Sequence, residues 1–140
     1  MTHPLIERLI NEFDYPLLDA DNYDEAVAGG TIALFFTEDP ARFPETLDLA
    51  VVLPELVQAF EGRFTAAVVD RSLEKSLQQT FNFRVWPALV FLRDGQYLGA
   101  LTRICDWQDY LLEIPEILDS KAGRNPGLGI PVVTEQRDAL

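Results

Sequence analysis

The fold is decided by the stretch Val85-Trp86-Pro87-Ala88-Leu89-Val90-Phe91-Leu92, in which a proline precedes an apolar run of strand length. This order predicts a turn that leads directly into a buried strand. A second run of the same kind is Thr31-Ile32-Ala33-Leu34-Phe35-Phe36. It is apolar on both faces, as a central parallel strand should be. The two runs predict a sheet that is covered on both sides.

The other helices and strands are predicted from turn-forming residues and from the spacing of apolar residues. Between two apolar runs stands Arg93-Asp94-Gly95-Gln96, and an Asp-Gly pair in that position is a strong hairpin signal. The order predicts a β-α-β unit, then an antiparallel hairpin and a closing helix. We expect strands over 15–18, 31–36, 64–70, 88–92 and 97–101, and helices over 5–13, 21 or 22–28, 47–60 with a kink at Pro54, 72–81 capped by Ser72, and 107–118 capped by Asp106.

The composition indicates one acidic globular domain. The chain has 140 residues, of which 48% are hydrophobic, and this suffices for a single core. Its formal net charge of −12 disfavours nucleic acid as a partner and favours cationic partners, although solubility alone would equally account for it. We expect the folded domain over residues 1–119 and a mobile tail, containing Gly, Pro and charged residues, over 120–140.

Residue counts exclude several kinds of site. The sequence holds one cysteine, Cys105, and one histidine, His3. An intrachain disulfide, a Cys-x-x-Cys redox cycle, a conventional Cys/His zinc site and a four-thiolate iron–sulfur cluster are therefore not available, and we expect neither metal nor cofactor. No apolar run approaches the ~18 residues that span a bilayer. Because the first residues lack the pattern of a secretory signal, we expect a cytoplasmic protein without membrane insertion.

Three features together resemble the thioredoxin superfamily over roughly residues 15–118. They are the proline-containing helix that ends in Phe60-Glu61-Gly62-Arg63-Phe64-Thr65, the strand that ends at Asp70, and Trp86-Pro87 ahead of a hairpin. The resemblance implies a thioredoxin-like α/β fold with a central mixed sheet and helices on both faces. It also implies a cis peptide bond before Pro87.

The residues of thioredoxin chemistry are absent. Laid over the thioredoxin pattern, Pro40 and Phe43 stand where the two cysteines would be, and Leu34 stands where a buried Asp would help to move protons. Without a thiolate nucleophile there is no thiol–disulfide exchange. We therefore expect a binding protein and not an enzyme.

A closer resemblance rests on three segments, 37–45 (TEDPARFPE), 81–91 (FNFRVWPALVF) and 95–101 (GQYLGAL). They resemble the HyaE/HupG/HoxO family of accessory proteins for [NiFe]-hydrogenase maturation. The resemblance implies a non-catalytic assembly chaperone for the hydrogenase small-subunit precursor, which binds its twin-arginine signal peptide or the immature subunit before export. Other hydrogenase maturation proteins are further candidate partners. A general peptide-binding or scaffold module, or a weak single-thiol redox protein using Cys105, are the alternatives.

The candidate peptide-binding residues lie in two segments. In thioredoxin-like proteins the backbone before the cis proline offers hydrogen bonds to an extended peptide, which places Trp86 and Pro87 first among the candidates. The alternative is that Pro87 only shapes a turn and that Trp86 packs in the core.

The second segment is acidic. Glu38, Asp39, Glu45 and Asp48 surround the former active-site loop, and carboxylates accept guanidinium groups in a bidentate way. Phe43 would accommodate apolar neighbours of those groups. In the alternative interpretation these acids are solvated, with Asp39 capping a turn, and Arg42 pairs with them locally instead of binding a partner carboxylate.

Overall fold

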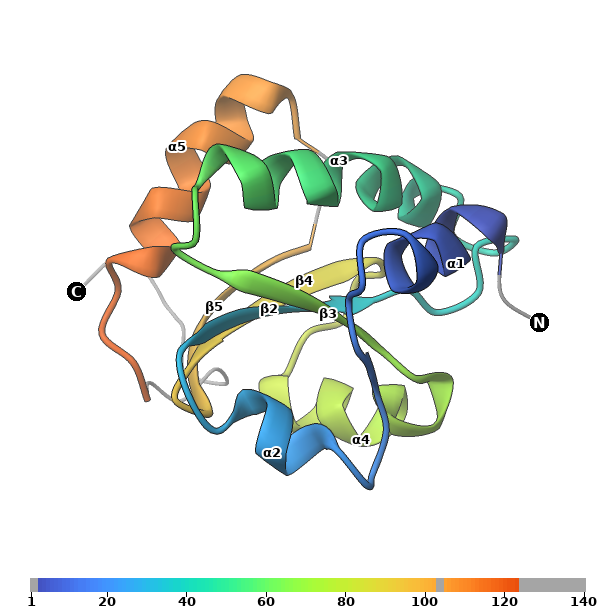
Figure 1. The fold of residues 1–140 in the computed structure, drawn as a ribbon, viewed down its shortest axis with the longest axis horizontal. Helices are drawn as coiled ribbons and strands as arrows, with labels where there is room; N and C mark the ends of the chain where they lie inside the picture. The colour runs from blue at the N-terminus through green and yellow to red at the C-terminus, as the bar shows by residue number, and fades with distance from the viewer. Residues whose placement is uncertain (1–2, 103–104, 124–140) are drawn as a thin grey trace.

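The computed structural model describes residues 3–102 and 105–123. The strands are β1 Leu17–Leu18, β2 Thr31–Phe36, β3 Thr65–Val69, β4 Ala88–Arg93 and β5 Gln96–Leu101, and the helices are α1 Pro4–Asn11, α2 Tyr23–Val27, α3 Glu45–Ala59, α4 Arg71–Phe81 and α5 Trp107–Leu118. The strands form one five-stranded sheet in the order β1-β3-β2-β4-β5. Helices α1, α3 and α5 cover one face, and α2 and α4 cover the other (Figure 1). This is the thioredoxin-like α/β fold that the sequence predicted.

The topology confirms the predicted β-α-β unit and hairpin. Strands β2 and β3 run parallel and are connected by α3, whereas β4 runs antiparallel to β2 and pairs Ala88 with Phe36. The hairpin turns at Asp94 and Gly95, whose φ angles of 51° and 81° are both left-handed. Two consecutive left-handed residues match the twist of the flanking strands, which explains the Asp-Gly pair.

Strand β2 supplies side chains to both cores because consecutive residues of a strand point to opposite faces. Phe35 packs with Leu9, Leu53 and other residues beneath α1, α3 and α5. Phe36 packs on the other face with Leu77 and Phe81 of α4. All five positions after Thr31 in this strand are buried, so its two-sided apolar pattern is explained by the two helical layers.

The first helix ends earlier than predicted. Helix α1 stops at Asn11, and the Phe13 N–H donates to the Arg8 carbonyl as the last turn widens. The chain then reverses at Asp14, whose φ of 58° is left-handed. The prediction that Phe13 continues the buried helical stripe is therefore wrong, and its side chain is exposed.

Two predicted caps are also corrected. Helix α4 begins at Arg71, and its N-cap is Asp70, whose Oδ2 accepts the Ser72 N–H at 3.0 Å. Ser72 is thus the capped residue and not the cap. Asp106 occupies the N-cap of α5 as expected, but its side chain makes no capping hydrogen bond.

The long helix and the tail complete the comparison. Helix α3 starts two residues before the predicted 47 and contains Pro54. The predicted tail over 120–140 lies outside the described residues from 124 onward. Within the described part, the Gly123 N–H donates to the Tyr97 carbonyl at 2.9 Å, so the chain still contacts the hairpin there.

Candidate functional site

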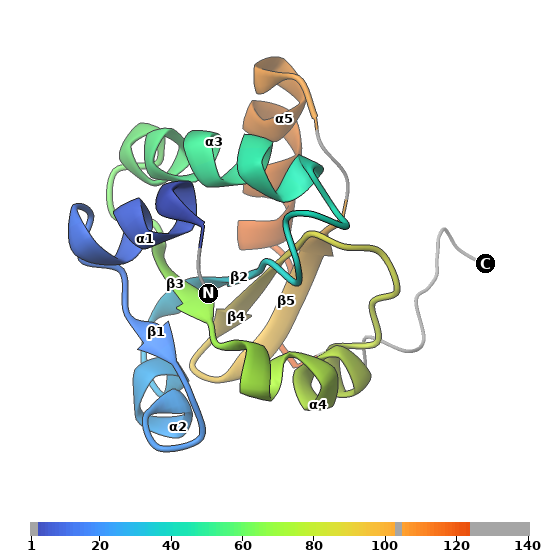
Figure 2. The ribbon, with the colours of Figure 1, turned by 90° about the vertical axis from the view of Figure 1, so that its right-hand side faces the viewer.

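The predicted site residues gather at one end of the sheet. The loop over 37–44 leaves the carboxyl end of β2, and the loop over 82–87 enters the neighbouring strand β4. Because Phe36 at the end of β2 pairs with Ala88 at the start of β4, both loops lie at the same end of the sheet (Figure 2). Helix α4 begins at this end as well, since it follows the carboxyl end of β3. Topology thus brings together three segments that are far apart in sequence.

The loop before β4 has backbone groups without hydrogen bonds to the described residues. The Trp86–Pro87 peptide is cis, which confirms the prediction. Trp86 is half-buried, with its ring edge-on to Phe83 at 5.0 Å between centroids and tilted against Phe36 at 6.4 Å. Val85 is 55% exposed. Within residues 3–102 and 105–123, no hydrogen bond engages the backbone N–H or C=O of Val85 or Trp86.

The loop after β2 is closed by its own contacts. Glu38 is only 7% exposed and has a left-handed φ of 48°. Its Oε1 accepts the Asp39 N–H at 2.6 Å, and its carboxylate lies 3.7 Å from Arg42 and 3.6 Å from Arg71. The sequence analysis assigned Glu38 to a surface acidic cluster. The structure instead buries it in a network with Asp39, Arg42 and Arg71.

Asp39 has the local role that the alternative interpretation gave it. Its Oδ1 accepts the Ala41 N–H at 3.0 Å, and its carbonyl accepts the N–H groups of Arg42 and Phe43. The Arg42 guanidinium lies over the half-buried ring of Phe43, 5.2 Å from the centroid. These contacts link the residues of the loop to one another in place of regular structure.

Glu74 is the residue that sequence reasoning missed. It lies on α4 and is 2% exposed, and its Oε2 accepts the N–H groups of Thr37 at 2.9 Å and Glu38 at 3.0 Å. The Thr46 hydroxyl donates to the Thr37 carbonyl at 2.8 Å from the other side. The available signal was its position on the apolar stripe of α4, three residues before Leu77 and seven before Phe81.

The Glu74 carboxyl titrates abnormally. Burial raises its pKa above the ordinary value of 4.5, against the lowering effect of the two backbone N–H donors and of Arg71. Its Oε1 lies 3.2 Å from Arg71 Nε but has no hydrogen-bond partner among the described residues. The charge of this group is therefore only partly compensated in the folded protein.

The remaining candidates are more peripheral. Glu45 and Asp48 are exposed and lie in the first turn of α3, where carboxylates favour the positive end of the helix dipole. Cys105 is half-buried, and its Sγ lies 4.0 Å from Glu113 Oε2, a negatively charged neighbour that does not stabilise a thiolate. Within the described residues no cluster of three potential ligands could hold a metal, and no helix is long and apolar enough to cross a membrane.

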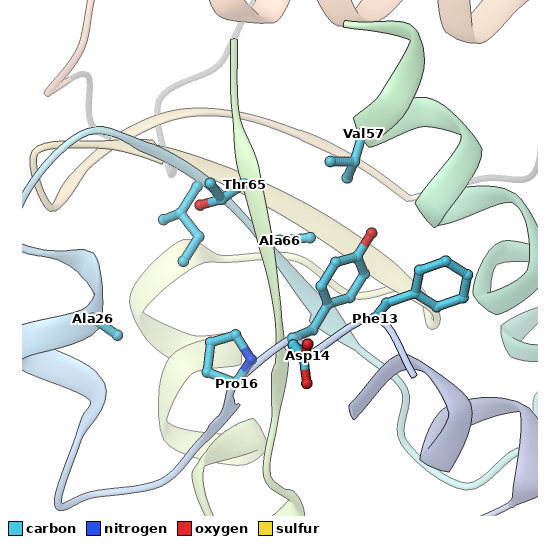
Figure 3. A pocket seen from close by; sticks show the side chains of 9 residues that line it. Phe13, Asp14, Pro16, Ala26, Val57, Thr65 and Ala66 are labelled. Atoms are coloured by element: carbon cyan, nitrogen blue, oxygen red, sulfur yellow. The ribbon is translucent and has the colours of Figure 1, made fainter. Parts of the chain in front are cut away.

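A second concavity lies at the opposite end of the sheet (Figure 3). Its volume is about 450 Å³, and it opens between the chain after α1, the start of β3 and the end of α3. Burial raises the pKa of Tyr15 in its wall. The sequence did not predict this pocket, because it forms where the first helix ends early. It is lined by Phe13, Asp14, Tyr15, Pro16, Ala26, Ile32, Val57, Thr65 and Ala66.

Comparison with known proteins bears on both fold and family. A crystal structure described as the hydrogenase expression/formation protein HupG of Rhodopseudomonas palustris matches with a TM-score of 0.53 and 41% identity, covering 74% of this chain and 94% of that one. Hydrogenase expression/formation protein HoxO of Azotobacter vinelandii is 49% identical over 138 residues, which are 97% of this chain and 90% of HoxO. HupG of Bradyrhizobium diazoefficiens is 38% identical over 135 residues, which are 96% of this chain and 91% of HupG.

The family model described as hydrogenase-1 expression protein HyaE matches residues 5–110. That range contains both loops of the candidate site, the buried Glu74 and all five strands. The similarity therefore extends over the whole sheet and the loops at its edge. The chain belongs to the HyaE family, together with the HoxO and HupG proteins.

Proposed function

We propose that this protein is a non-catalytic assembly chaperone for the precursor of the [NiFe]-hydrogenase small subunit. It binds the twin-arginine signal region, or the immature subunit, in the cytoplasm before export. Family membership supports the connection to hydrogenase formation, since the relatives are named for hydrogenase expression and formation. The observation that carries peptide binding is the backbone of Val85 and Trp86, which makes no hydrogen bond within residues 3–102 and 105–123, at a loop where Val85 is 55% exposed.

Unpaired backbone beside a central strand suits an extended partner. A peptide that pairs with such backbone groups gains main-chain hydrogen bonds, which give affinity without requiring a particular sequence. The half-buried Trp86 ring and the exposed Val85 side chain provide an apolar surface at the same place. An apolar run next to the arginines of the signal would pack against the side chains of Val85 and Trp86. Pro87, which is buried, fixes the direction of the loop.

The charge distribution favours a basic partner. The chain carries a formal net charge of −12, and Glu45 and Asp48 are exposed beside the loop over 37–44. Opposite charge accelerates the encounter of two proteins and selects partners more than it adds affinity. Adjacent arginines in the precursor would therefore be attracted to this end of the sheet. Phe43 completes the contact surface on that side, with the Arg42 guanidinium over its ring.

The absence of catalysis is part of the proposal. Pro40 and Phe43 occupy the loop positions where thioredoxin-like redox proteins carry thiols, and Cys105 lies in a separate segment before α5. A chaperone needs reversible contacts and no chemical step. Exchange reactions need a thiolate nucleophile, which this loop lacks.

Co-purification with the small-subunit precursor tests the proposal directly. Tagged protein would be mixed with precursor that carries or lacks its signal segment, under reducing anaerobic conditions. Retention of the signal-bearing form alone locates the contact on the signal, and retention of both forms moves it to the mature subunit. If neither form is retained, the chaperone proposal is wrong and a general peptide-binding module is left.

The matched control compares the half-buried Trp86 with an exposed apolar side chain elsewhere. Trp86→Ala removes the aromatic surface of the proposed site, and Leu112→Ala truncates a 68%-exposed residue on α5. Retention should fall in the first variant and stay unchanged in the second. Equal retention by both variants would remove the loop before β4 from the binding surface.

A further inference from the structure

Two buried carboxylates lie side by side at the candidate site beneath arginines of the same chain. Arg71 alone reaches both, with Nε 3.2 Å from Glu74 Oε1 and Nη2 3.6 Å from Glu38 Oε1. Arg42 approaches the other oxygen of Glu38, with Nη1 at 3.7 Å from Oε2. The pair of acids therefore has a pair of guanidinium groups as its cover.

The acids are not saturated by these contacts. Glu74 Oε1 is buried and accepts no hydrogen bond from any described residue, although its carboxyl is 2% exposed and its other oxygen accepts two. Within the described residues the Glu38 carboxylate accepts one hydrogen bond, from the Asp39 N–H, and its arginine contacts at 3.6 and 3.7 Å exceed hydrogen-bond length. A buried carboxylate with an unused acceptor is unusual and indicates room for a better donor.

The covering arginines are held weakly. The side chains of Arg71 and Arg42 are 61% and 67% exposed, whereas those of Glu38 and Glu74 are 8% and 3% exposed. A guanidinium that is already largely in water stays hydrated when it leaves a carboxylate, and the uncovered acid favours a replacement cation. Displacement of the two arginines therefore uncovers the acids without unfolding the loop, because the backbone N–H donors of Thr37 and Glu38 keep Glu74 in place.

We propose that Glu38 and Glu74 form a guanidinium-binding site which Arg42 and Arg71 occupy in the free protein. A partner's arginine displaces one or both of these side chains and takes over their contacts with the carboxylates. The chain's own arginines thus act as an autoinhibitory cover that a competing guanidinium removes. The identity of the partner as the hydrogenase precursor rests on the proposed function, but the site itself rests on the contacts above.

The chemistry of the site selects arginine over lysine. A guanidinium is planar and offers parallel N–H donors that fit a carboxylate with two good hydrogen bonds. In the free protein neither Arg42 nor Arg71 achieves that geometry on Glu38. A partner arginine that replaces Arg42 or Arg71 would have both of its parallel donors available for the carboxylate. A lysine ammonium supplies the charge but not the fork.

The test uses the full chain and two short synthetic peptides. One peptide carries two adjacent arginines followed by apolar residues, and the other carries lysines in their place. Affinities would be measured by titration calorimetry at one fixed ionic strength. We expect the arginine peptide to bind at least about fivefold more tightly than the lysine peptide, because only guanidinium forms bidentate pairs.

Variants of the cover separate exchange from net charge. Arg71→Ala and Arg42→Ala should each tighten binding of the arginine peptide about threefold to fivefold, since the competing side chain is gone. Arg63→Ala changes the net charge equally but breaks an exposed ion pair with Asp119 at the other end of β3. It should leave the affinity within about twofold of the parent. Thermal unfolding of each variant checks that the domain remains folded.

Removing an acceptor carboxylate should weaken the binding of the arginine peptide, whereas removing a covering arginine should tighten it. Glu38→Gln should weaken the arginine peptide about tenfold while the lysine peptide changes less. Equal shifts in the Arg71→Ala and Arg63→Ala variants would overturn the inference, as would an unchanged affinity in Glu38→Gln. The precursor supplies an independent readout. If the precursor is retained equally by all of these variants, the proposed arginine exchange is wrong and the chaperone function stands. If the arginine peptide shows the exchange but the precursor is not retained, only the chaperone function is wrong.

Discussion

The two loops at the edge of the sheet differ in what satisfies their backbone. The backbone N–H groups of the loop over 37–44 find acceptors within the protein. Glu74 of α4 accepts the N–H groups of Thr37 and Glu38, and Asp39 caps the next turn. The loop over 82–87 leaves the backbone groups of Val85 and Trp86 without partners among the described residues. The first loop is therefore held by contacts within the protein, whereas the second has backbone groups that we propose bind a partner chain.

The strongest way to break this comparison is to remove the acceptor that closes the first loop. Glu74→Ala leaves two buried N–H groups unsatisfied, and we expect it to lower the free energy of unfolding by about 2–4 kcal/mol. Urea denaturation measures the loss, and hydrogen exchange should localise it to Thr37 and Glu38. Glu55→Ala, which truncates an exposed acid on α3, serves as the control. Equal denaturation midpoints for the two variants would show that the loop does not depend on Glu74.

The second loop is broken at its aromatic residue. We expect Trp86→Ala to weaken partner binding about tenfold or more, because aromatic side chains in the centre of an interface carry much of the affinity. The fold should survive, since Trp86 is half-buried and the core beneath it is formed by Phe36 and Phe83. Surface plasmon resonance measures the affinity, and circular dichroism follows the unfolding. Loss of cooperative unfolding would instead make Trp86 a core residue.

The internal closure also predicts a dependence on pH. Burial raises the pKa of Glu74 above 4.5, so the folded state binds a proton that the unfolded state has already released. This contribution to stability is complete below pH 4.5 and is lost as the pH rises through the raised value. Arg71 and Glu38 are the charged groups that face the carboxyl.

Glu74→Gln isolates that contribution, because the amide oxygen still accepts the two N–H groups while the titration is removed. The free energy of unfolding, measured by urea denaturation in steps of pH above 4.5, should decline less in Glu74→Gln than in the parent. Glu55→Gln provides a variant with the same charge change at an exposed position. Parallel pH profiles for all three proteins would mean that Glu74 does not titrate abnormally.

The smallest expected effect concerns the approach of the partner. Neutralising Glu45 and Asp48 to Gln and Asn should slow association about twofold and flatten its dependence on salt, because both acids are exposed and act only at long range. Stopped-flow association at several ionic strengths measures this. Neutralising Glu12 and Glu25, which are exposed elsewhere, gives the charge-matched control. A rate unchanged by either pair would remove the acidic surface from the encounter.

Sequence reasoning succeeded where the signal is local. Asp94 and Gly95 fix the hairpin through their left-handed backbone, and the two-sided apolar pattern of β2 identifies the centre of the sheet. It failed at Phe13, where helical spacing continues beyond the last helical hydrogen bond.

The candidate site was predicted only in part, because its decisive contacts are long-range. Trp86 and Pro87 were found through the resemblance of their segment to a known loop. Glu74 was not found, since its bond to Thr37 joins residues 37 positions apart and depends on how α4 is placed after β3. For the same reason Glu38 read as a surface acid, although two arginines and a backbone N–H enclose it.

The strand order has a consequence for the protein during its own synthesis. Strand β2 is synthesised early, but its antiparallel neighbour β4 follows β3 and α4 in the sequence. Thr31 of β2 therefore cannot pair until Arg93 has been synthesised. Until residues 88–93 leave the ribosome, the most apolar strand of the nascent chain has one open edge. Open edges of apolar strands pair readily with other chains. A protein that we propose shields an unfinished subunit thus passes through an unshielded stage itself, which ends when its second half closes the sheet.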